Sequence, residues 1–223
     1  MCQRYVVPHQ AAAEREFLPA NAWWNFAPKF NVSVGQYVPA IRLHEGQSEG
    51  VMVRWGLIPS WVEGAPDGRK RACVQQSRIE TSRSCKTAWA NGQRCIIPMG
   101  GFYCWQLTAA GYRQPYFVRL EDRSAFGVAG LWDRWTSEED DVIESCALIT
   151  VPANELVAEI AGAVSDMPAI LRRKDYDPWL RGTPAEAKDA LQPYTARWMQ
   201  AYPVSPRVNS AHIDDPSLIR AAG

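Results

Sequence analysis

Short apolar runs that alternate with polar positions dominate the chain, and this pattern predicts strands. Seven runs are rich in branched and aromatic residues and are bounded by Gly, Pro or Asn/Asp turns. They are Tyr37–Arg42, Val51–Trp55, Arg94–Pro98, Phe102–Leu107, Tyr116–Leu120, Ala125–Gly130 and Cys146–Val151. The runs between positions 94 and 151 follow one another closely, which favours antiparallel meanders over crossovers through helices.

Helical spacing is rarer. The segment Asn154–Ala163 carries apolar residues three and four positions apart, which predicts an amphipathic helix. Thr183-Pro184-Ala185-Glu186 has the pattern of a capping box with proline at the first helical position, so a helix should begin there. A third helix is expected within Ala11–Phe17. No repeat or long linker divides the chain, so the pattern predicts one β-rich α+β domain over residues 1–223, with mostly antiparallel strands and a few short helices.

Composition supports a folded protein. Of the 223 residues 47% are hydrophobic and only 22% are charged, which argues against intrinsic disorder. The apolar stretches are too short to span a bilayer, and the first residues lack the apolar region of a secretory signal. A cytoplasmic location is therefore expected. Most of the ten tryptophans should be buried, but Trp61 follows a Pro-Ser turn and is expected to be exposed, where it could stack on a base.

The formal net charge is zero, but the charges are unevenly distributed along the chain. Between Arg69 and Arg94 seven basic residues stand against Glu80 alone, and the balance reverses between Glu121 and Glu144. The basic segment can form a face that attracts phosphates. The alternative is a solvated loop with no ligand.

The six cysteines lack CxxC spacing, and the three histidines lie far from them and from one another. Neither a zinc site nor any other metal or cofactor is therefore expected. Five of the cysteines are interpreted as small buried hydrophobic residues, and as reduced thiols in a cytoplasmic protein.

Cys2 differs because removal of Met1 would make it the N-terminal residue. Its α-amine, with a reference pKa of about 7.7–8.0, is partly unprotonated at neutral pH, and its thiol is a strong nucleophile. An amine and a thiol on adjacent carbons condense with an aldehyde, first to an imine and then to a five-membered thiazolidine. The alternative is an ordinary cysteine that happens to follow the initiator methionine.

Motifs along nearly the whole chain resemble the SRAP family, the SOS-response-associated peptidases that shield abasic sites. The start Met1-Cys2-Gln3-Arg4-Tyr5 is similar to the family's Met-Cys-Gly-Arg-Phe. Further similar motifs follow in order: 30–32, 54–61, 77–81, 94–98, 101–103, 153–156, 167–168, 203–205 and 208–209.

The resemblance implies a β-rich SRAP fold with a basic cleft for single-stranded DNA that ends at Cys2. It also implies a covalent thiazolidine link to the aldehyde of an abasic site. Arg4 and Arg78 match family arginines expected to hold phosphates, and Asn31 and Trp61 match positions along the DNA path. Arg83, from the basic segment, completes the expected DNA-binding set. The partner implied is single-stranded DNA with abasic sites, bound by a monomer.

Three expected active-site residues differ from the family pattern. Gln76 replaces an asparagine, and Cys104 replaces the acid/base glutamate of Gly-Phe-Tyr-Glu-Trp. The histidine of Ile-His-x-Arg-Met-Pro is missing: aligned from the left Ala161 takes its place, and aligned from Met167 Val164 does. If the fold is kept, Cys104 should lie beside Cys2, and oxidation could join the two thiols.

Cys2, Gln76 and Cys104 are thus the expected catalytic residues of a divergent member with attenuated chemistry. A thiol is a poor substitute for a carboxylate in proton transfer, which typically contributes about 100- to 10,000-fold. The alternative is a non-catalytic module that binds single-stranded DNA. A third hypothesis takes the peptidase name literally, with removal of Met1 as the only cleavage, so enzymatic activity is left open.

Overall fold

The computed structural model describes residues 4–63 and 68–222. Its larger sheet closes into a barrel, because β11 pairs with β10 along one edge and with β5 along the other. The barrel strands, in the order in which they are hydrogen-bonded, are β11 (Val142–Pro152), β10 (Phe126–Thr136), β7 (Arg94–Met99), β4 (Tyr37–His44) and β5 (Gln47–Trp55). All of these pairs are antiparallel except β11–β5.

Three short strands extend this sheet. They are β2 (Asn21–Ala22) beside β5, and β6 (Cys73–Gln75) and β12 (Asp166–Pro168), both beside β11. The second half of β11 thereby holds two segments that are far apart in the sequence next to each other.

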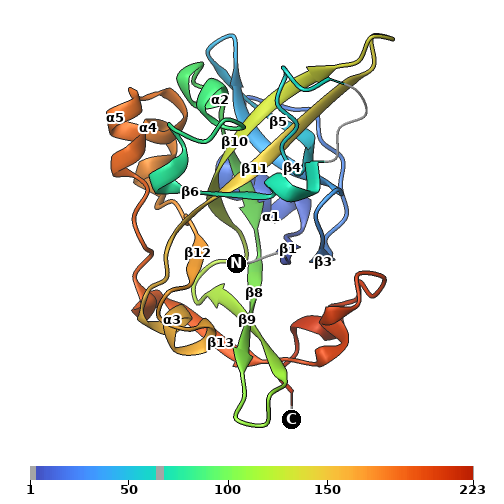
Figure 1. Cartoon of the computed structure of the whole chain (residues 1–223), viewed down its shortest axis with the longest axis vertical. Helices are drawn as coiled ribbons and strands as arrows, with labels where there is room; N and C mark the ends of the chain where they lie inside the picture. The colour runs from blue at the N-terminus through green and yellow to red at the C-terminus, as the bar shows by residue number, and fades with distance from the viewer. Residues whose placement is uncertain (1–3, 64–67, 223) are drawn as a thin grey trace.

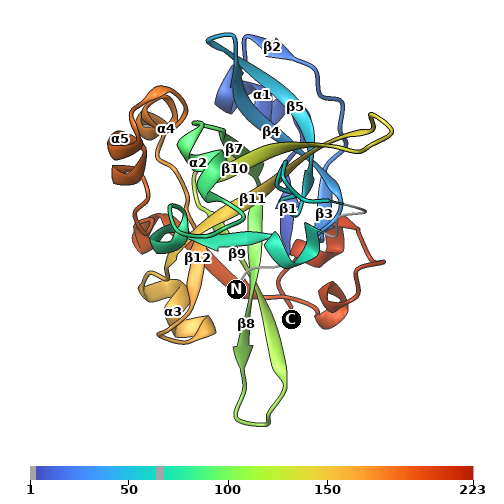
Figure 2. The same ribbon diagram turned by 45° about the horizontal axis from the view of Figure 1, so that its top comes forward.

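The second sheet has five antiparallel strands and contains the N-terminal strand. In order they are β13 (Met199–Pro203), β9 (Arg113–Leu120), β8 (Gly101–Leu107), β1 (Tyr5–Val7) and β3 (Lys29–Val32). The hairpin of β8 and β9 projects from the body of the molecule, as Figures 1 and 2 show. β1 lies between β8 and β3 in this sheet, so this strand is paired on both sides.

The helices are short and lie outside the sheets. They are α1 (Gln10–Phe17), α2 (Lys86–Ala90), α3 (Glu155–Ala161), α4 (Tyr176–Arg181) and α5 (Pro184–Asp189). Figure 1 shows α4 and α5 together on one side, and α3 near β12. Single 3-10 turns connect other elements: η1 (Gly68–Arg71), η2 (Gln76–Arg78), η3 (Arg173–Asp175), η4 (Ala196–Trp198), η5 (Pro206–Asn209) and η6 (Pro216–Ile219).

The β-rich α+β class with mostly antiparallel strands is confirmed, and each of the seven expected strands is present. The capping box is also confirmed: the Thr183 hydroxyl accepts from Glu186 N, and the Glu186 carboxylate accepts from Thr183 N. The helix expected at Asn154–Ala163 begins one residue later, because Asn154 caps it by accepting from Val157 N at 3.0 Å.

The buried interior contains five tryptophans: Trp24, Trp55, Trp89, Trp135 and Trp179. Trp55 meets Tyr5 of β1 edge to face, with ring centroids 4.9 Å apart, which ties the N-terminal strand to the barrel. Of the five described cysteines, four are buried as expected, whereas Cys73 is only half-buried. Among the described residues, no helix is both long and apolar enough to cross a membrane.

Candidate functional site

Pairing of β1 with β8 brings the first described residue beside the segment that carries Cys104. Tyr5 lies opposite Phe102, and Tyr103 N donates to Arg4 O at 3.1 Å. Cys104 is the next residue of β8. Cys2 lies outside the described residues, and so does its expected contact with Cys104.

Arg4 is half-buried and is held by two asparagines. Its guanidinium donates to Asn31 Oδ1 at 3.0 Å and to the Asn209 carbonyl at 3.2 Å. Partial burial lowers the pKa of Arg4 from its ordinary value. The Asn209 side chain accepts from Trp105 Nε1 at 2.8 Å, so one short network connects Arg4 to β8.

Asn31 does not face solvent, although the sequence suggested a position along the DNA path. Its side chain is 1% exposed, and Nδ2 donates to the carbonyls of Val208, Ser210 and Ile213 at 2.8–3.2 Å. These contacts use the amide donors within the protein. Asn31 therefore fixes the C-terminal segment and orients Arg4, and it offers no free donor to a ligand.

Tyr103 has a similar structural role on β8. Its hydroxyl donates to the Phe30 carbonyl at 2.7 Å, which joins β8 to the start of β3 across β1. Burial raises the pKa of Tyr103 well above its ordinary value. The phenol is therefore a fixed hydrogen-bond donor at neutral pH.

A cavity of about 310 Å³ opens beside this network. Its lining includes Tyr103, Cys104 and Trp105 of β8, Arg113 of β9, Ala161 of α3 and Asp166 of β12. That volume is at the lower end of the range of about 300–1,000 Å³ for small-molecule sites. Cys104, itself 4% exposed, thus contributes to the wall of a cavity that also carries a carboxylate and a guanidinium.

The two alternatives for the missing histidine lie in different places. Ala161 lines the cavity, whereas Val164 is fully exposed on the surface. The left-hand alignment therefore corresponds to the residue that borders the cavity, and its methyl group leaves space there without supplying a proton donor.

The segment that carries Gln76 and Arg78 is tied to the same wall. Gln75 Nε2 donates to Asp166 Oδ2 at 2.8 Å. Gln76 and Arg78 follow directly in η2, where Gln76 is half-buried and Arg78 is exposed. This hydrogen bond bridges 91 positions in the sequence, and it results from the placement of β6 and β12 on the same part of β11.

Trp61 and Arg83 are brought together by the fold. The Arg83 guanidinium carbon lies 4.5 Å from the centre of the Trp61 ring, and Trp61 is 41% exposed while Arg83 is half-buried. An open groove of about 490 Å³ borders Trp61, and Glu63, Glu138 and Glu139 contribute to its other walls. A polyanion would meet favourable charge at Arg83 and unfavourable charge along this acidic side.

One residue of the basic segment, Arg94, does not contribute to a surface that could bind phosphates. Arg94 is 6% exposed, and its guanidinium donates to the carbonyls of Trp179 and Gly182 at 2.6 and 2.5 Å. Arg94 anchors α4 to β7, so counting it toward a phosphate-binding face was wrong. The physical reason is that charge counted along a sequence does not distinguish a strand interior from a loop.

Sequence reasoning missed Arg113 and Asp166. Asp166 occupies the place of the arginine in the family pattern His-x-Arg-Met-Pro, and this departure was a signal that could have been used. Arg113 lies in the β8–β9 hairpin with no motif around it, so only the fold identifies it.

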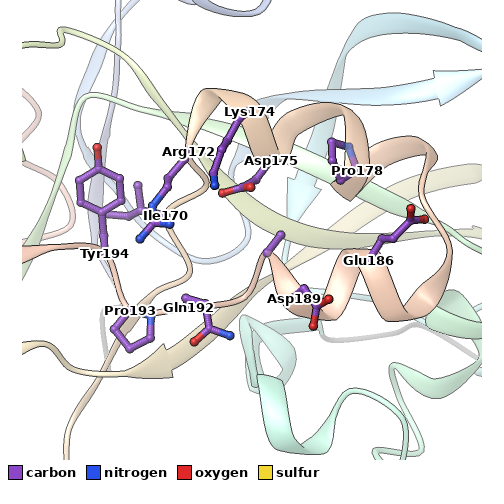
Figure 3. A pocket seen from close by; sticks show the side chains of 11 residues that line it. Ile170, Arg172, Lys174, Asp175, Pro178, Glu186, Asp189, Gln192, Pro193 and Tyr194 are labelled. Carbon is purple, nitrogen blue, oxygen red and sulfur yellow. The ribbon is translucent and has the colours of Figure 1, made fainter.

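A second cavity, of about 320 Å³, lies beside α4 and α5 (Figure 3). Its walls mix the basic residues Arg172 and Lys174 with the acidic residues Asp175, Glu186 and Asp189. None of the residues expected from the sequence lines it. Within residues 4–63 and 68–222, no group of three or more His, Cys, Asp or Glu side chains is arranged to hold a metal ion.

Comparison with known proteins places this geometry in context. A family model described as SOS response associated peptidase (SRAP) matches residues 1–211. The abasic site processing protein YoqW of Bacillus subtilis is 31% identical over 210 residues, which cover 92% of this chain and 90% of that protein. The mouse abasic site processing protein HMCES is 26% identical, over 88% of this chain and 66% of that protein.

Solved structures agree. A protein from Bacteroides thetaiotaomicron superposes with a TM-score of 0.78 at 27% identity, covering 86% of this chain and 85% of its own. A protein from Bordetella bronchiseptica also reaches 0.78 at 24% identity, covering 92% of this chain and all of its own, and this supports the fold alone. Motifs, fold and family model therefore lead to one conclusion, that the chain belongs to the SRAP family.

Proposed function

We propose that this protein processes abasic sites: it binds single-stranded DNA and forms a thiazolidine crosslink through Cys2 after removal of Met1. The observation that carries the proposal is the position of Arg4, two residues after Cys2. Arg4 pairs with Tyr103 beside the cavity that Cys104 lines. Two peptide units span at most about 7 Å, so Cys2 has the reach to act in this neighbourhood. The relatives named abasic site processing proteins support the assignment.

The chemistry requires only groups that an N-terminal cysteine provides. The α-amine attacks C1′ of the open-chain abasic sugar, and a molecule of water leaves as the imine forms. The thiol sulfur then adds to C1′, and its proton passes to the imine nitrogen, which closes the thiazolidine. No oxidant or reductant is needed. We expect most of the increase in rate over the reaction in solution to come from holding the aldehyde next to Cys2.

The reaction should be slower than in relatives with the complete motif. Cys104 is a buried thiol where the family has glutamate, and Ala161 lies at the cavity where a histidine is expected. Gln76 retains an amide, but its longer side chain changes where the amide points. These substitutions remove proton-transfer groups, whereas the nucleophilic Cys2 is retained in the sequence. We therefore expect crosslinking that is slower but not abolished.

The DNA path is proposed to run over the exposed or half-buried cations Arg4, Arg78 and Arg83, with Trp61 as the stacking surface. Asn31 contributes indirectly, since it orients Arg4 from the interior. Single-stranded DNA suits this arrangement, because its bases are free to stack on an exposed indole.

The decisive experiment incubates the protein with single-stranded DNA that carries one abasic site and resolves the products on a denaturing gel. A shifted band that Cys2→Ala abolishes and Cys73→Ala leaves intact supports the proposal. The intact mass of the same preparation must lack Met1. Absence of any shifted band from a preparation without Met1 would refute crosslinking.

The altered active site favours a second candidate, a non-catalytic module of the same fold that binds single-stranded DNA. In that case the protein would retard intact single-stranded DNA on a native gel while giving no band that survives denaturation. We further propose that residues 1–223 act as one monomeric domain, which light scattering of the purified protein tests directly.

A further inference from the structure

Asp166 is the one carboxylate among the described residues that line the cavity beside Cys104. It lies on β12, opposite Pro152 of β11, so its backbone is fixed by sheet pairing rather than carried on a loop. Its side chain is half-buried. A fixed, partly shielded carboxylate facing a cavity is suited to proton transfer with a bound molecule.

One oxygen of Asp166 is held and the other is available. Oδ2 accepts the hydrogen bond from Gln75 Nε2 at 2.8 Å, while Oδ1 accepts none within the described part of the chain. Gln75 therefore fixes the rotation of the carboxylate and leaves one oxygen to exchange protons with a ligand. Arg113 lines the same cavity and adds a positive charge to its wall.

We propose that Asp166 is a catalytic residue of this chain, the carboxylate that carries protons during crosslink formation in place of the one lost at position 104. The proposal rests on the function proposed above. It also assigns Gln75 as a positioning residue, because Gln75 acts on the aldehyde only through Asp166.

The proton movements balance without any other reagent. When the amine attacks C1′, one proton must pass from its nitrogen to the former aldehyde oxygen, which gives a carbinolamine. A second proton must follow the same route as the carbon–oxygen bond breaks and water leaves. Asp166 accepts each proton from nitrogen and gives it to oxygen, so it ends unchanged. The thiol proton then passes to nitrogen as the ring closes.

The test measures the single-turnover rate of crosslinking on abasic single-stranded DNA, with protein in excess. Asp166→Asn keeps the shape and removes the proton carrier, so the rate should fall by at least about tenfold, since positioned proton transfer typically contributes about 100- to 10,000-fold. Asp166→Glu should retain most of the rate. The matched control is Asp189→Asn, an exposed aspartate of the second cavity, which should react like the wild type.

A further readout separates catalysis from a structural effect. In the Asp166→Asn background, Cys104→Glu should restore crosslinking, because it returns a carboxylate to another wall of the same cavity. Thermal unfolding of each variant establishes that it is folded.

The outcomes distinguish this inference from the proposed function. Wild-type protein that fails to crosslink would refute the function, and the inference with it. Wild-type crosslinking with an Asp166→Asn rate within twofold would overturn the inference alone. A faster Asp166→Asn variant would also overturn it, and would show that the carboxylate acts by repelling the DNA backbone.

Discussion

The Arg4 guanidinium donates to the buried Asn31 side-chain oxygen at 3.0 Å, and the other end of the same amide holds the C-terminal segment. Arg4, the described residue nearest in sequence to the proposed nucleophile, is therefore oriented by contacts with a C-terminal segment. Asn31 joins Arg4 to residues 208–213, so it links the stability of the fold to the geometry around Arg4.

Asn31→Ala should lower the free energy of unfolding by about 2–4 kcal/mol, because it removes the donor that the Val208 and Ile213 carbonyls accept from and one of the two acceptors of the Arg4 guanidinium. Urea unfolding measures the change. The control is Asn21→Ala on the exposed strand β2, which should change stability by no more than about 0.5 kcal/mol. Equal stability of the two variants would contradict the structural role of Asn31.

Replacing Arg4 and Arg78 together with alanine should weaken binding of single-stranded DNA and flatten its salt dependence. Removing one cation that binds a phosphate reduces the slope of log K against log salt by about 0.7 for single strands, because fewer counterions are released. Fluorescence anisotropy at several salt concentrations gives the slope.

The charge-matched control replaces Arg172 and Lys174, two exposed cations of the second cavity, with alanine. A slope of log K against log salt equal to that of the wild type in this control would show that the loss of salt dependence depends on which cations are removed. If both double variants flatten the slope equally, the assignment of the DNA path to Arg4 and Arg78 fails.

Alkaline pH should destabilise the protein through Cys95, which burial gives a pKa of about 12 against an ordinary value of 9. Between these values the unfolded chain releases the thiol proton and the folded chain keeps it. The contribution of the Cys95 thiol to the free energy of unfolding is therefore fully present below pH 9. Above pH 9 it falls by about 1.4 kcal/mol per pH unit until pH 12. Urea unfolding between about pH 8 and 10.5 should show a shallower decline in Cys95→Ala. Identical slopes in the two proteins would refute the contribution of Cys95.

Much of the fold follows from local pattern. The branched and aromatic runs predicted the barrel strands, and the cap at Thr183 predicted α5 because its side-chain partner is three residues away. Strand ends were less accurate: β10 continues past Gly130 to Thr136, since pairing with β11 extends it beyond the apolar run. α2 was not predicted, because Cys85, the residue before it, makes no side-chain capping hydrogen bond and is not a residue type that indicates a helix start.

The site was only partly predictable for a related reason. Motifs pointed to Arg4, Cys104 and Gln76, because the resemblance to the family is matched residue by residue along the sequence, and their roles stay predictions. The burial of Asn31 depends on a segment 182 positions away, and the Gln75–Asp166 contact depends on two strands meeting on β11. Neither the burial of Asn31 nor the Gln75–Asp166 contact produces a pattern in the local sequence, so both are identified only from the three-dimensional structure.

Trp61 should contribute to DNA binding through its exposed ring and through Arg83, which lies over that ring. Stacking of a base on an aromatic side chain is worth about 1–3 kcal/mol, so Trp61→Ala should weaken binding of single-stranded DNA by about 5- to 140-fold. The fold offers a matched control in Trp198, which is 51% exposed and has Arg197 at 4.9 Å from its ring centre. Trp198→Ala removes the same kind of pair from outside the proposed path and should leave affinity unchanged.

A double-mutant cycle of Trp61 with Arg83 then asks whether the two act as one unit. Coupling is expected, because Arg83 is held by the ring and both would meet the same nucleotide. Additive losses would mean that Arg83 binds phosphate independently of the indole. Equal losses in Trp61→Ala and Trp198→Ala would mean that the stacking surface has been placed on the wrong face of the protein.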